Sequence, residues 1–170
     1  TLFTLLQTAT FWKAVGYSFV KIASGFFLAL GVGTICAVLA SAFGAVRVLL
    51  NPVLRLIKAV PVASFIILAL FWLSSSRNLS VLISFLMVLP VIYTNVLQGI
   101  ESTEKELLEM ATVFRIPFGK RIRFIYLPAV LPYFVSACSV GLGFCFKSGI
   151  AAEIIGLPAN SIGERLYEAK

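Results

Sequence analysis

The sequence predicts an all-α protein, a polytopic bundle of transmembrane helices that forms one domain over residues 1–170. Composition gives the first indication, because 60% of the residues are hydrophobic and only 12% are charged, against roughly 25% charged in an ordinary globular domain. The second is the grouping of apolar residues into four long runs, since a helix crosses a bilayer with roughly 20 apolar residues. The third is a single polar island, residues 101–128, between the last two runs.

Each apolar run is expected to form one transmembrane span, at residues 17–44, 59–73, 79–97 and 127–146. Gly25 and Gly33 are among the small residues that predict close helix packing in the first span. Prolines mark the expected irregularities. Pro52 indicates a short loop between the first two spans, Pro61 a bent entry to the second, and Pro90 an interruption of the third.

Basic residues in the connections predict the orientation of the bundle. Three precede the second span and five lie in the polar island, whereas the turn at residues 74–78 holds only Arg77. Because cytoplasmic loops carry an excess of Lys and Arg, the loop at residues 101–126 is expected on the cytoplasmic side.

Several functional classes are excluded by the residues that the chain lacks. It contains no His and no Asp, and its three cysteines lie singly in apolar runs, so we expect no catalytic triad, metal site or bound cofactor. Gly119 and Lys120 lack the rest of a phosphate-binding loop, which places any ATP hydrolysis on another chain. The net charge of +7 is assigned to topology and anionic lipid rather than to nucleic acid.

The polar island is expected to contain two short helices joined near Arg115 and Ile116. Thr103 and Glu106 have capping-box spacing, which predicts that the first helix starts there. Pro117 fits the first position of the second helix. An apolar stripe at helical spacing follows the capping box, formed by Leu107, Leu108, Ala111 and Phe114. From charge alone the island is either a hairpin lying on anionic lipid or a docking element.

The order of residues in the island resembles the loop of the membrane subunits of ABC importers, the binding-protein-dependent permease family. The match consists of Glu109 and Ala111, then Ile125, then Leu127 and Pro128. Met110 stands where the family has Ala. Arg115 stands where it has Gly, so the elbow is expected to turn at Ile116 and Pro117 instead, since the residue before proline is steered away from helix.

The resemblance extends over roughly residues 17–170. The segments Lys58–Pro61 and Gly141–Glu153 are similar to those of nitrate, sulfonate and taurine permeases. Members of that family usually have six helices, so this chain resembles one that lacks the first and last. The resemblance implies a multi-pass protein of the bacterial cytoplasmic (inner) membrane.

What the resemblance implies for function is a permease subunit, not an enzyme, in an ATP-driven importer. Its expected partners are a dimer of cytoplasmic ATPase subunits, a second permease subunit (a homodimer), and an extracytoplasmic solute-binding protein that delivers a small solute such as sulfonate, nitrate or taurine. The residues expected to couple it to the ATPase are Leu107, Leu108, Glu109, Met110, Ala111, Phe114, Arg115, Ile125, Leu127 and Pro128. The alternative is an ion-coupled secondary carrier or a channel.

Four polar residues within or after the spans are candidates for a permeation pathway or gate. Tyr93 and Asn95 either line an aqueous path or make hydrogen bonds between helices. Glu153 is a carboxylate among apolar neighbours, and an ionisable residue inside a membrane is a functional candidate by default. Lys147 is a candidate partner, in which case the two residues form a structural ion pair.

Overall fold

The computed structural model describes residues 9–72, 78–157 and 161–164, so most of the expected turn at 74–78 lies outside the described residues. Its principal elements are all helical, and they follow one another as α2 (Ala9–Ala42), α3 (Gly44–Ala59), α4 (Val62–Trp72), α5 (Leu79–Glu101), α6 (Lys105–Val113), α7 (Phe118–Arg121), the π-helix η2 (Ile122–Tyr126) and α8 (Leu127–Gly156).

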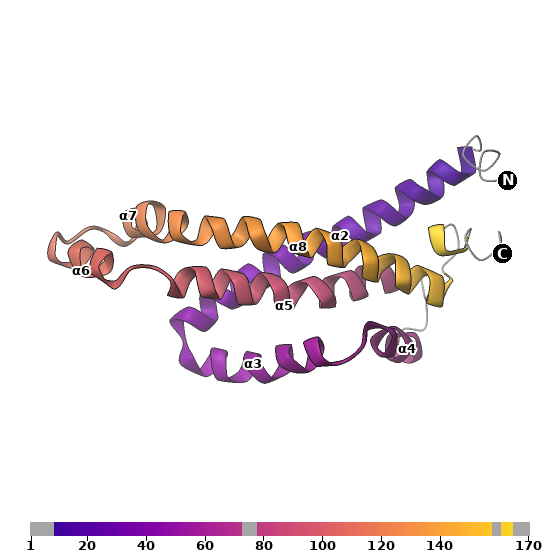
Figure 1. The fold of residues 1–170 in the computed structure, drawn as a ribbon, viewed down its shortest axis with the longest axis horizontal. Helices are drawn as coiled ribbons and strands as arrows, with labels where there is room; N and C mark the ends of the chain where they lie inside the picture. The colour runs from indigo at the N-terminus through magenta and orange to yellow at the C-terminus, as the bar shows by residue number, and fades with distance from the viewer. Residues whose placement is uncertain (1–8, 73–77, 158–160, 165–170) are drawn as a thin grey trace.

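The core forms where α5 packs against both α2 and α8 (Figure 1). Small residues allow the helices to approach closely, as the sequence predicted. A Cβ atom on Gly25 would lie 2.6 Å from the carbonyl oxygen of Val81 on α5. One on Gly149 of α8 would lie 2.6 Å from the side chain of Ile22. The α2–α5 and α8–α2 contacts therefore depend on the absence of a side chain at these positions.

The predicted loop around Pro52 is wrong, because this segment forms the 16-residue helix α3 with Pro52 inside it. The three basic residues expected in that connection, Arg47, Arg55 and Lys58, therefore lie along α3. One face of α3 is apolar at helical spacing, and Val46, Leu50, Leu54 and Ile57 pack on the same hydrophobic core as α2 and α5. Burial of that stripe outweighs the cost of an interior proline, which removes one backbone hydrogen bond.

The bent entry predicted at Pro61 is confirmed. Val60 is extended, with φ −85° and ψ 132°, and α3 and α4 meet at an angle of 106°. An extended residue is what a following proline favours. The expected span at 59–73 thus contains the 11-residue helix α4, and α3 and α4 together make one broken span or a re-entrant segment.

Pro90 does not interrupt α5, contrary to the expectation. The helix continues from Leu79 to Glu101, and side chains in its second half bond back to its own carbonyls. Thr94 Oγ1 donates to the carbonyl of Pro90 at 2.7 Å, and Asn95 Nδ2 donates to that of Val91 at 2.8 Å. Within the described residues, three helices are long and apolar enough to cross a membrane, or four if the bent pair counts as one span.

Candidate functional site: the elbow and the Glu153 cluster

The polar island folds into an elbow at the end of the bundle where α5 ends and α8 begins (Figure 1). We call residues 103–128 the elbow. It consists of α6, a turn, α7, η2 and the first two residues of α8, and the helical run from Phe118 to Gly156 has no break. Two short helices joined near Arg115 were predicted, and both are present. Pro117 is the residue before α7 rather than its first residue.

The predicted capping box is wrong, although α6 begins close to the predicted position. Glu104 is the N-cap, with φ −60° and ψ 125°, and no side chain caps the helix. Thr103 instead belongs to the exit from α5, where its amide donates to the carbonyl of Ile100 at 3.3 Å. Its hydroxyl oxygen is buried and has no hydrogen-bond partner among the described residues. Too few residues separate the two helices for Thr103 to serve both ends.

The turn of the elbow lies at Arg115, which corrects the expectation that Ile116 and Pro117 make it. Arg115 adopts a left-handed conformation with φ 49°. The amide of Ile116 donates to the carbonyl of Ala111 at 2.9 Å, and the amide of Arg115 donates to the carbonyl of Thr112 at 3.1 Å. This is the hydrogen-bond pattern of the Schellman motif, in which glycine usually holds the left-handed position. Arg115 thus makes the turn that the family's glycine would make, at a conformational cost.

Arg121 locks the elbow, a role that the sequence did not reveal. Its guanidinium reaches back from α7 to the end of α6. Nε donates to the carbonyl of Ile116 at 2.8 Å, and Nη2 donates to that of Ala111 at 3.0 Å. Nη1 lies 3.3 Å from the hydroxyl oxygen of Thr112. A cation at the C-terminal carbonyls of a helix adds donors to acceptors that the helix itself does not fully occupy, and it complements the helix dipole.

The predicted coupling residues divide into a buried anchor and an exposed surface. Ala111 is fully buried inside this chain, so its side chain faces the elbow itself rather than solvent. Leu108 and Ile125 are partly buried. The remaining members are exposed, namely Leu107, Glu109, Met110, Phe114, Arg115, Leu127 and Pro128.

Glu153 lies at the opposite end of α8 in what we call the Glu153 cluster, formed with Ser18, Ser80 and Ile162. The carboxylate is fully buried. Ser18 Oγ donates to Oε2 at 2.7 Å, and Ser80 Oγ donates to Oε1 at 3.2 Å. Ser18 Oγ also accepts from the amide of Ile162 at 3.1 Å. Lys147 is exposed and does not form the proposed ion pair. Among the described residues, the side chains that bond to Glu153 are the hydroxyl groups of Ser18 on α2 and Ser80 on α5.

The structure places Tyr93 and Asn95 within the helix packing. Tyr93 is buried, and its hydroxyl donates to Oδ1 of Asn51 on α3 at 3.1 Å, a hydrogen bond between helices. Asn95 is partly buried and bonds within α5. At the elbow end of the bundle, Arg47 of α3 forms a salt bridge with Glu101 of α5. These contacts fix α3 against α5.

Comparison with known proteins gives consistent matches over most of the chain. Similar proteins include the putative aliphatic sulfonates transport permease of Bacillus subtilis, 26% identical over 153 residues, which cover 90% of this chain and 55% of that protein. The taurine transport system permease of Escherichia coli is 24% identical over 164 residues, covering 93% of this chain and 60% of that protein. The bicarbonate transport system permease of Synechococcus elongatus is 23% identical over 164 residues, which cover 96% of this chain and 59% of that protein.

The chain therefore spans less than two thirds of the length of these relatives. The profile of one family, described as binding-protein-dependent transport system inner membrane component, matches residues 6–170. The helical bundle with several apolar, membrane-length helices agrees with that description. This chain belongs to the binding-protein-dependent transport system inner membrane component family, the permease components of ABC transporters.

Proposed function

We propose that this chain is a permease subunit of an ATP-driven importer and that its elbow couples the membrane helices to a cytoplasmic ATPase dimer. A second permease subunit, here a second copy of this chain, completes the pathway. An extracytoplasmic binding protein delivers a small solute, with sulfonate, nitrate or taurine as the candidates. The observation that carries the proposal is the elbow, a locked helical unit with an exposed surface, in a chain whose residues 6–170 match the permease family.

The geometry of the elbow suits the transmission of force. The Schellman turn and the three donors of Arg121 hold α6 and α7 in one arrangement. The helical run from Phe118 to Gly156 then carries any displacement of the elbow along α8 into the bundle. A partner that moves α6 therefore moves a long helix rather than a flexible loop.

The surface that the elbow leaves exposed is amphipathic. Leu107, Met110 and Phe114 supply apolar contacts of the kind that fill a groove in a partner. Glu109 lies among them and can set the register against a basic group, since charge complementarity contributes more to specificity than to affinity.

Charge reversal at Glu109 tests the proposal. Wild type and a Glu109→Arg variant are expressed in native membranes and affinity-purified, and a co-purifying ATPase subunit is identified by its Walker-type sequence. Glu109 is exposed, so the variant is expected to fold. The ATPase is expected with wild type and not with the variant.

Glu106→Arg is the matched control, because it makes the same charge reversal on α6 outside the motif. It is expected to retain the ATPase. Equal loss with both variants would mean that the net charge of the island, rather than register at Glu109, governs association. Absence of an ATPase from every intact chain would overturn the importer function and favour the ion-coupled carrier or channel.

A further inference from the structure

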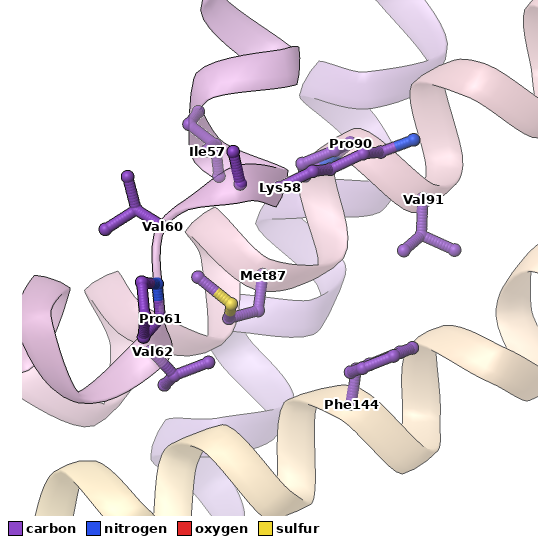
Figure 2. Close-up of a pocket in the computed structure, with 10 residues that line it drawn as sticks. Ile57, Lys58, Val60, Pro61, Val62, Met87, Pro90, Val91 and Phe144 are labelled. Carbon is purple, nitrogen blue, oxygen red and sulfur yellow. The ribbon is translucent and has the colours of Figure 1, made fainter.

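The break between α3 and α4 lies beside the middle of a membrane-length helix. Residues of the break and Pro90, the midpoint of α5 (Leu79–Glu101), line the same cavity (Figure 2). Backbone that is not helical is tolerated at this depth only when protein covers it or when it lines a water-filled space. The structure supplies such a space at this point.

The cavity has a volume of about 450 Å³. Its walls come from three parts of the fold, with Val60 and Pro61 at the break, Met87 and Val91 on α5, and Phe144 on α8. Figure 2 shows the Lys58 side chain extending from the end of α3 across α5 beside Pro90. Cavities of roughly 300–1,000 Å³ with apolar walls and few polar groups are typical of small-molecule sites.

Lys58 gives the cavity its charge. Among the described residues that line it, Lys58 is the one with an ionisable side chain. Its Nζ lies 3.4 Å from Oγ1 of Thr94, and the Thr94 hydroxyl donates to the carbonyl of Pro90 and so keeps a lone pair toward the ammonium. In the part of the chain that the structure describes, no carboxylate lies within salt-bridge distance of Lys58. Lys58 is exposed in this chain, so an anion in the cavity can reach its ammonium and supply the missing counter-charge.

We propose that this cavity is a transient site for a small organic anion on the translocation path. The acidic group binds the Lys58 ammonium, and a short hydrocarbon portion lies against Met87, Val91 and Phe144. The inference rests on the proposed function and adds to it a location and a ligand class. An inorganic oxoanion would satisfy Lys58 but leave the apolar walls uncovered, so a ligand with both parts fits the cavity better.

The test uses the full chain in lipid nanodiscs, with 1-pentanesulfonate as the probe and ligand-observed NMR titration as the measurement. Binding to empty nanodiscs is subtracted. Wild type is expected to bind 1-pentanesulfonate. The control probe 1-pentylammonium has the same alkyl group and the opposite charge, and it is expected to bind at least about tenfold more weakly. Equal binding of the two probes would overturn the proposal.

Variants locate the site. Lys58→Gln is expected to weaken pentanesulfonate binding by at least about tenfold, and Lys58→Arg to retain most of it. Arg55→Gln is the matched control, since it removes an exposed cation from the same helix outside the cavity, and it is expected to bind as wild type does. Met87→Trp, which fills the cavity without changing the charge, is also expected to reduce binding. Unchanged binding by Lys58→Gln, or equal loss with Arg55→Gln, contradicts the assignment.

Pentanesulfonate binding and ATPase co-purification test the cavity and the proposed function separately. Lys58 lies away from the elbow, so Lys58→Gln is expected to co-purify with the ATPase as wild type does. Loss of pentanesulfonate binding with the ATPase retained supports the site. Retained binding in a chain that recruits no ATPase would leave the cavity intact and overturn the importer function instead.

Discussion

The two ends of α8 differ in whether their charged side chains are exposed or buried. At the elbow end, most charged side chains, Glu109 among them, are exposed, and backbone groups are satisfied within the elbow by the turn at Arg115 and the guanidinium of Arg121. At the other end, Glu153 is fully buried and takes its hydrogen bonds from two other helices. The first arrangement leaves a surface free for a partner, whereas the second ties α2, α5 and α8 together.

This difference predicts where substitutions act. Changes in the Glu153 cluster should lower the stability of the whole bundle, because three helices share its hydrogen bonds. Changes in the elbow should alter α6 and α7 locally and leave the bundle intact.

The largest effect is expected at Glu153. In Glu153→Leu the hydroxyls of Ser18 and Ser80 lose their acceptor in a buried place, which we expect to lower the free energy of unfolding by about 3 kcal/mol. Glu153→Gln keeps an acceptor oxygen and should cost less. Unfolding of the purified protein in mixed micelles by SDS titration measures both. A leucine variant as stable as wild type would show that the cluster does not hold the helices together.

The next effect concerns the contact of α2 with α5. Gly25→Ala places a methyl group 2.6 Å from the backbone oxygen of Val81, so the helices must separate, at a cost of about 2 kcal/mol. Gly31→Ala is the control on the same helix, because nothing lies within 4 Å of its added Cβ, and it should be neutral or slightly stabilising. The same SDS titration compares them, and equal effects would contradict the close packing at Gly25.

A smaller and local effect is expected at Arg121. Arg121→Gln removes donors to the carbonyls of Ala111 and Ile116, and we expect α6 to lose about 1–2 kcal/mol of protection against opening. Hydrogen exchange of the α6 amides measures this loss. Lys120→Gln, an exposed neighbour, should leave the exchange unchanged. Equal exchange of the α6 amides in the two variants would show that Arg121 does not hold α6 in place.

The smallest effect should be an increase in the stability of α6. Arg115→Gly relieves the left-handed strain at φ 49°, and we expect α6 to be stabilised by about 1 kcal/mol. Glycine in the middle of the helix, as in Met110→Gly, should instead destabilise α6 by about 1 kcal/mol. Exchange rates of the α6 amides that shift in the same direction for both variants would contradict a left-handed turn at Arg115.

Features set by local sequence could be predicted. The apolar runs, the two helices of the elbow and the bend at Pro61 each follow from residues close together in the chain. Helix α3 was missed because Pro52 was interpreted as a loop signal, although Val46, Leu50 and Leu54 already showed helical spacing. That spacing could have identified the helix.

Features set by distant residues could not be predicted. Ser18 and Glu153 are 135 residues apart in the chain, and nothing near Glu153 in the sequence points to a serine on the first described helix. The nearest basic residue on α8, Lys147, was the available candidate and is not the partner. Arg121 is ten residues from Ala111, and its contact depends on the path of the turn at Arg115.

Photo-crosslinking from the elbow tests whether α6 contacts an ATPase subunit. A photoreactive amino acid replaces Met110, which is exposed on α6, and in a separate control replaces Phe71, which is 87% exposed at the far end of α4. After illumination of native membranes, we expect an adduct between the Met110 probe and a subunit with a Walker-type sequence, and none from the Phe71 probe. A Met110 probe that labels only lipid, in a chain shown to be intact, would contradict the coupling role of the elbow.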